Sequence, residues 1–248
     1  MSREALEYTQ FETRLREALQ TDVMTADRVD NVITDEIPPR LYGKLLLCFS
    51  AISSETSAGS NPIDAAIAIE FAFLHQYLHM ISRIDADVSD SIEASVYPED
   101  TDAAILDGDL LQSCAFTRLS GAAEAPKTTH RCYEILARAS VECYERLHED
   151  STAAVTTPLL GAAAQIGSII GGVDRTAARE IDQLTRSIAE AIPVKVPRTQ
   201  NVDPNSVPSV STVNSTIEEL DTIISSSVST TRSLEPLLKD TVLHRTVQ

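Results

Sequence analysis

The chain has 248 residues, a formal net charge of −17 at pH 7, 43% apolar residues and only 4% aromatic residues. This length suffices for one large domain with its own core, and Ala and Ile in place of aromatic residues favour close-packed helices. The acidity argues against nucleic-acid binding, because phosphate contacts require a basic face. Only four of the 20 basic residues are lysines, against 37 Asp plus Glu, which favours adaptation to a high-salt cytoplasm over an ordinary acidic protein.

The four cysteines form no Cys-x-x-Cys pair, and each occurs in an apolar helical context. We therefore expect buried thiols in a reducing compartment rather than a disulfide or a metal site. The first residues are polar and charged, unlike a signal peptide, and the uncharged, Gly- and Ala-rich segment 155–173 is short for a comfortable membrane span. These features predict a cytoplasmic protein without an integral membrane segment.

Helical periodicity accounts for most of the chain, and no segment shows the alternation that strands require. Residues 1–192 are expected to form the main bundle, 193–213 a Pro/Ser-rich linker or mobile loop, and 214–248 C-terminal helices packed on the same bundle. The predicted class is all-α, with about nine helices. Their expected bounds are 2–19, 41–53, 62–84, 102–119, 128–148, 157–172, 175–192, 215–229 and 234–246.

The helix predicted over 62–84 is the central one. Asn61 is a plausible N-cap followed by Pro62 in the first turn, and apolar residues then occupy nearly every side, as in a buried helix. The same helix carries His75 and His79 at i and i+4, which could face one ligand. A metal would need a third ligand, which only Glu70 or an acidic loop could offer. Two hydrogen-bonded core histidines are the favoured interpretation.

Three segments occur in the order and spacing of a known family. Residues 65–70 read Ala-Ala-Ile-Ala-Ile-Glu, residues 104–111 read Ala-Ile-Leu-Asp-Gly-Asp-Leu-Leu, and Pro-Leu-Leu at 158–160 is followed by Ile-Gly-Ser-Ile-Ile-Gly-Gly at 166–172. Together they resemble the trans-prenyl diphosphate synthases, or polyprenyl synthetases, of isoprenoid biosynthesis. The resemblance covers roughly residues 37–192 and implies a single helical bundle of the isoprenoid synthase fold.

The metal ligands of that family do not carry over. Its first Asp-rich motif, which binds Mg²⁺ and through it the allylic diphosphate, would fall at Met80, Ile81 and Ile84. Its second would fall at 193–197, where no carboxylate occurs. The carboxylates nearest the first position are weak candidates, because on a continuing helix the outer two diverge by about 140° and would converge only in a loop. These candidates are Asp85, Asp87 and Asp90.

The diphosphate-binding cations of the family are also mostly missing. No arginine occurs between Arg83 and Arg118, so the Arg-Arg-Gly loop is absent, and the lysine of the Lys-Thr pair falls near Val155. The residues that the resemblance would place at substrate-binding positions are Arg40, Lys44, Glu70, Asp109 and Thr156.

Three functional hypotheses follow. The resemblance implies a catalytically degenerate accessory subunit, similar to the small subunits of two-component prenyl diphosphate synthases. The alternatives are an active prenyltransferase with displaced ligands, which alone would need Mg²⁺ as a cofactor, and a helical scaffold unrelated to prenyl transfer. An accessory subunit would form a homodimer or a heterodimer with an active synthase. The helix at 102–119 is the expected interface, because it is more apolar than one buried stripe requires, with Phe116 as its test residue.

Overall fold

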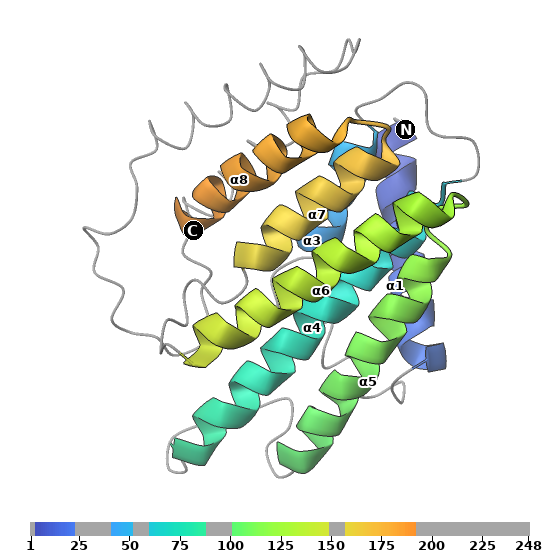
Figure 1. Cartoon of the computed structure of the whole chain (residues 1–248). Coiled ribbons are helices and arrows are strands. Elements are labelled where there is room, and N and C mark those ends of the chain that lie inside the picture. The colour runs from blue at the N-terminus through green and yellow to red at the C-terminus, as the bar shows by residue number, and fades with distance from the viewer. Residues whose placement is uncertain (1–2, 23–40, 52–59, 88–100, 149–156, 192–248) are drawn as a thin grey trace.

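The computed structural model describes residues 3–22, 41–51, 60–87, 101–148 and 157–191. These residues form seven α-helices and, within the described ranges, no strand (Figure 1). The helices are α1 (Arg3–Asp22), α3 (Leu41–Ser50), α4 (Pro62–Asp87), α5 (Thr101–Ser120), α6 (Pro126–His148), α7 (Thr157–Ile170) and α8 (Arg175–Ala191). The all-α prediction is confirmed for this part of the chain, whereas the expected linker and the helices beyond residue 213 lie outside it.

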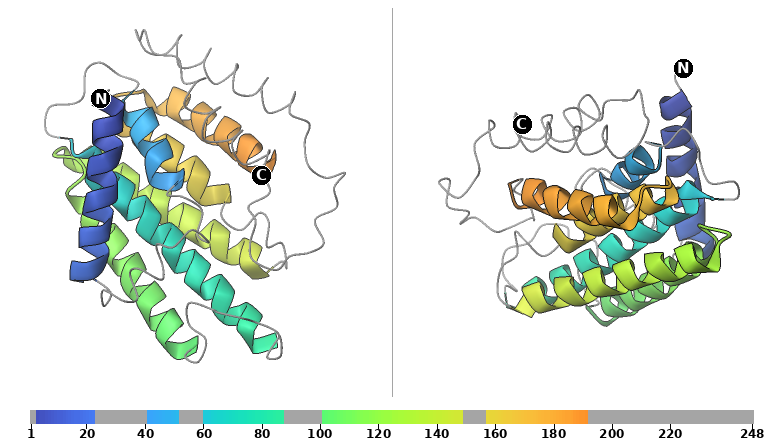
Figure 2. Two further views of the ribbon diagram at one scale, coloured as in Figure 1. Left: turned by 180° about the vertical axis from the view of Figure 1, so that it is seen from behind. Right: turned by 45° about the horizontal axis from the view of Figure 1, so that its top comes forward.

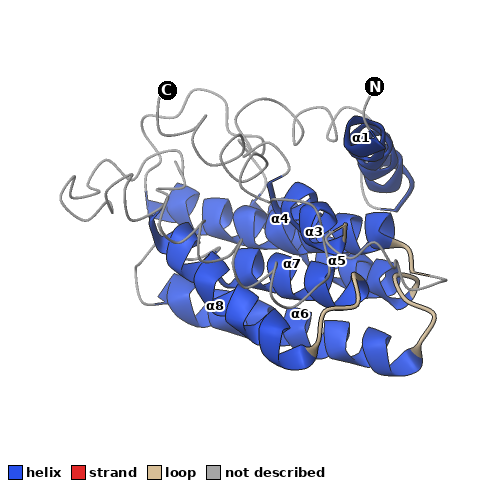
Figure 3. Cartoon of the chain, turned by 90° about the horizontal axis from the view of Figure 1, so that it is seen from above, coloured by secondary structure: helices blue, strands red, loops and turns tan. Residues whose placement is uncertain are grey.

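Helix α4 is the centre of the bundle, as predicted. It contacts α1, α3, α5, α6 and α7, and Figure 2 shows α1 crossing the bundle while α5 and α6 run along α4. Seen from above in Figure 3, α1 stands at one edge of the bundle. Asn61 caps α4, its Oδ1 accepting a hydrogen bond from the amide of Asp64 at 3.4 Å. The helix ends at Asp87, three residues beyond the expected end.

Helix α7 is buried along nearly its whole length and packs on α3, α6 and α8. A Cβ at Gly167 would collide with the carbonyl oxygen of Leu46 on α3, and one at Gly171 would lie 2.9 Å from the carbonyl oxygen of Ser50. The Gly-x-x-x-Gly spacing therefore serves close packing of two helix backbones inside the bundle. No helix in the described ranges is both long and apolar enough to span a membrane.

Local capping chemistry sets several helix boundaries. Asp174 Oδ1 accepts hydrogen bonds from the amides of Thr176 at 2.8 Å and Ala177 at 3.2 Å, which makes it the N-cap of α8. Helix α6 begins at Pro126, two residues before the expected Thr128, because proline fits the first helical turn without losing a hydrogen bond.

The expectation of buried thiols is confirmed for three of the four cysteines. All four thiols are free; Cys48, Cys132 and Cys143 are buried, and Cys114 is half-buried. Burial raises the pKa of the Cys132 and Cys143 thiols to about 12. These two cysteines are core residues rather than nucleophiles, because the reactive form of a cysteine is the thiolate.

Candidate functional site

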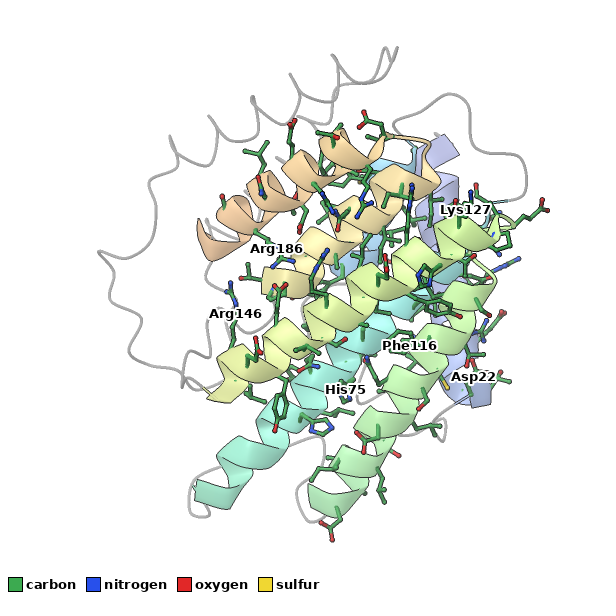
Figure 4. The ribbon with its side chains drawn as sticks, in the orientation of Figure 1. Asp22, His75, Phe116, Lys127, Arg146 and Arg186 are labelled. Atoms are coloured by element: carbon green, nitrogen blue, oxygen red, sulfur yellow. The ribbon has the colours of Figure 1, made fainter. Side chains whose placement is uncertain are left out.

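Three side chains that can bind a cation meet between α4 and α5. His75 and His79 lie one turn apart on α4, with ring centroids 4.4 Å apart, and Figure 4 shows His75 on the side of α4 that faces α5. His79 Nε2 lies 3.2 Å from Asp109 Oδ1 on α5. One donor atom from each of the three residues lies within 4.8 Å of the other two. We call these three residues the His–His–Asp cluster.

The cluster is buried at one end and open at the other. His75 Nδ1 is shielded from solvent and has no hydrogen bond of ordinary geometry, whereas the Asp109 side chain is 62% exposed. The pKa of His75 is lowered, chiefly by burial and then by the neighbouring His79, while the backbone of Gly108 and the charge of Asp109 act in the opposite direction. The neutral imidazole of His75 is therefore favoured.

Gly108 makes room for the two imidazoles against α5. A Cβ at this position would lie 3.1 Å from His79 Cδ2 and 3.5 Å from His75 Nδ1. The first distance is tight, so a larger residue would push the His79 ring away from Asp109. Gly108 and Asp109, which resemble the family's Gly-Asp segment, therefore both contribute to the cluster. Gly108 leaves space for the two rings, and Asp109 supplies the carboxylate.

The expected third partner of the two histidines is wrong. Glu70 is buried and accepts a hydrogen bond from the Gly43 amide at 2.7 Å, which ties α4 to α3. Its place on the helix explains this, because Glu70 precedes His75 by five residues and points about 140° away from it. The third group is Asp109. The expectation of two hydrogen-bonded histidines agrees with His79, which contacts Asp109, whereas Nδ1 of His75 has no hydrogen bond of ordinary geometry.

The other residues expected at substrate-binding or metal positions do not gather at this site. Lys44 forms an ion pair with Glu12 of α1 at 3.0 Å. Asp85 and Asp87 lie in the last turn of α4, where the backbone is described but the side chains are not. The residues outside the described ranges are Arg40, Asp90 and Thr156. Since α4 is helical through Asp87, a loop that could bring Asp85, Asp87 and Asp90 together cannot begin before residue 88.

An ion-pair network around Arg186 is a feature that the sequence interpretation missed. On α8, Arg186 Nε donates to Asp182 Oδ1 at 2.7 Å, and Nη1 pairs with Glu142 of α6. Burial alone would lower the pKa of Arg186, but the hydrogen bonds and charges of the two carboxylates outweigh it and raise the pKa. Gly161 of α7 lies beneath this network, and a Cβ there would collide with the Asp182 carboxylate.

The sequence predicts more apolar residues on α5 than one buried stripe requires. In the structure, some of these residues lie in the core and others are exposed at the surface. Phe116 is half-buried against Tyr133 of α6, with ring centroids 5.7 Å apart, so it packs within the monomer. Large apolar side chains do remain exposed on α5 and α6, and we call these four residues the apolar outer face. They are Leu106 (68% exposed), Leu110 (42%), Val141 (56%) and Tyr144 (60%).

Several solved structures have a similar fold. A geranyltranstransferase from Methanosarcina mazei superposes with a TM-score of 0.71 at 15% sequence identity, covering 97% of each chain. The chain has the fold of the trans-prenyl diphosphate synthases. The small subunit of the geranyl diphosphate synthase from Antirrhinum majus is also similar, with a TM-score of 0.67 at 13% identity over 97% of this chain and 99% of that one.

A third solved structure is also similar. The decaprenyl diphosphate synthase from Rhodobacter capsulatus gives a TM-score of 0.61 at 15% identity, over 98% of this chain and 90% of that one. No protein-family sequence profile and no curated protein sequence matches the chain. The chain thus has the prenyl synthase fold at low sequence identity, which agrees with the short, scattered segments that carry the resemblance.

Proposed function

We propose that this protein is a catalytically degenerate, polyprenyl synthetase-like accessory subunit that pairs with an active prenyl diphosphate synthase. The observation that carries the proposal is the composition of α4. Helix α4 lies at the centre of the fold. Nevertheless, Met80, Ile81 and Ile84 occupy the positions at which the family resemblance would place metal-binding carboxylates.

The chemistry of prenyl transfer explains why these positions matter. A diphosphate leaves an allylic carbon only when its developing charge is stabilised, and in this family the resemblance assigns that task to Mg²⁺ held by two carboxylate clusters. Apolar side chains at the first cluster and proline-rich sequence at the second supply no ligand. Three of the cations in the described ranges, Lys44, Arg118 and Arg186, are engaged in ion pairs with neighbouring acidic residues, which agrees with a non-catalytic role.

The apolar outer face supports association with a partner. In α5 the buried residues Ala104 and Leu111 mark the direction of the core. At 100° per residue, Leu106 points about 140–160° away from them and Leu110 about 100–120° away. Helix α6 contacts α5 and carries Val141 and Tyr144 exposed. Large exposed apolar side chains are enriched at protein–protein interfaces, and the resemblance places the dimer contact of the family on helices near the centre of the sequence, including the one that carries the Gly-Asp segment.

The test is co-expression with the active prenyl diphosphate synthase of the same organism. We expect a heterodimer whose prenyl chain-length distribution or rate differs from that of the synthase alone. A double variant, Leu106→Glu with Leu110→Glu, should weaken the complex at least about a hundredfold, because two buried leucines contribute ~3 kcal/mol or more.

The matched control is Gln183→Glu, which adds a carboxylate to an exposed position on α8 and should leave the complex intact. A wild-type protein that remains monomeric in high salt, both alone and beside the synthase, would overturn the accessory role. A heterodimer that the double variant and the control form equally well would instead refute Leu106 and Leu110 as part of the contact.

A further inference from the structure

We propose that the His–His–Asp cluster of α4 and α5 is a binding site for a divalent transition metal of the zinc class. The site comprises His75 and His79 from one helix and Asp109 from the next, with a further coordination position open to solvent beside Asp109. This inference does not depend on the accessory role, because it rests only on the donor atoms and their geometry.

The types of donor atom point to this class of metal. Two imidazole nitrogens and one carboxylate oxygen are ligands that Zn²⁺ and its first-row neighbours accept, whereas Mg²⁺ and Ca²⁺ prefer sites made of oxygen atoms. Two histidines at i and i+4 on one helix face are a recurrent metal-binding spacing. A site with three protein ligands keeps a position for water or another ligand.

The distances are close to those of a coordinated metal. Zn²⁺ bonds of 2.0–2.2 Å in tetrahedral geometry place neighbouring donor atoms about 3.3 Å apart. His79 Nε2 and Asp109 Oδ1 already stand 3.2 Å apart. The widest separation within the cluster is 4.8 Å at most, about 1.5 Å more than a coordinated metal would require.

Two independent features favour a ligand over a purely structural contact. The first is His75 Nδ1, which is buried without a hydrogen bond of ordinary geometry, at a cost that a metal ligand would remove. The second is Gly108, which leaves space for both rings against the backbone of α5. A simple His79–Asp109 ion pair would require neither feature.

The experiment uses the full-length protein, stripped with a chelator and titrated separately with Zn²⁺ by calorimetry and with Co²⁺ by visible absorption. We expect one equivalent to bind with release of heat, an increase of Tm on Zn²⁺ addition, and Co²⁺ bands without thiolate charge transfer. His79→Ala and Asp109→Asn should each weaken binding by at least about tenfold, since losing even an outer-shell partner of a ligand costs 10–100-fold. Gly108→Ala should weaken it in the same direction.

The matched control is His130→Ala, which removes an exposed histidine that also pairs with a carboxylate, Glu134, one turn away. It should bind metal like the wild type. The Asp109→Asn variant keeps the shape of the side chain, so unchanged circular dichroism separates loss of a ligand from loss of fold. The proposal is overturned if the wild type binds no metal, if the two ligand variants bind as well as the wild type, or if the Co²⁺ spectrum shows thiolate ligation.

Discussion

The Arg186 network provides the sharpest test of how the α6–α7–α8 side of the bundle is held together. Arg186→Met keeps the apolar stem but removes the guanidinium from Asp182 and Glu142. The side chains of Arg186, Asp182 and Glu142 are 19%, 13% and 31% exposed. The variant therefore leaves the largely buried Asp182 carboxylate without its cation, and leaves Glu142 with only the more distant Arg138 at 3.9 Å. Breaking a fully buried pair costs about 3–5 kcal/mol, and the partial exposure of Glu142 reduces this to about 2–4 kcal/mol.

The assay is urea unfolding followed by far-ultraviolet circular dichroism, together with thermal unfolding. For a chain of this size each kcal/mol lowers Tm by about 2–4 °C, so Arg186→Met should melt about 4–16 °C below the wild type. The deficit should persist in 1 M salt, because buried pairs are screened little. His130→Ala breaks a pair whose side chains are 73% and 60% exposed, and it should change the free energy of unfolding by less than about 0.5 kcal/mol. An Arg186 variant no less stable than this control would refute the reasoning.

Three further predictions concern packing, an aromatic contact and thiol chemistry. Gly161→Ala should destabilise the protein by about 1–3 kcal/mol in the same urea assay, because its Cβ would displace the Asp182 carboxylate; wild-type stability would show that α8 shifts freely. Phe116→Glu should destabilise the protein and promote aggregation, measured by light scattering, since a half-buried carboxylate would face the Tyr133 ring; a variant as stable and as soluble as the wild type would contradict this. Cys132 and Cys143, with pKa values of about 12, should carry a thiolate fraction of only ~10⁻⁴ at pH 8. They should react with a disulfide reagent only after unfolding, and rapid labelling of either in native protein would contradict their burial.

Much of the fold was predictable because its signals are local. The Asn61 and Asp174 caps, the all-round apolar character of α4 and the Gly-x-x-x-Gly spacing of α7 each specify a helix or its packing from residues close in sequence. Helix ends were less certain: α4 continues to Asp87, and no cap signal or proline marks the expected end. The expected C-terminal helices and the proline-rich segment lie outside the described residues and stay predictions.

The candidate site was only half predictable. The spacing of His75 and His79 was visible in the sequence, but their third partner depends on the register between α4 and α5, which no local pattern encodes. Asp109 was singled out for its family position, not for its neighbours. The Arg186 network was missed for the same reason, because Glu142 lies 44 residues away in sequence and becomes a neighbour only through the packing of α6 against α7 and α8.

The central claim is that this chain keeps the prenyl synthase fold without its catalysis, and prenyl transfer by the purified protein alone tests it most directly. The measurement is formation of radiolabelled product from isopentenyl diphosphate and an allylic diphosphate, with saturating Mg²⁺. We predict no product above the level without protein, because the first metal-binding position consists of Met80, Ile81 and Ile84. Turnover that is lost in Asp85→Ala or Asp87→Ala would contradict the account and establish an active prenyltransferase with displaced ligands.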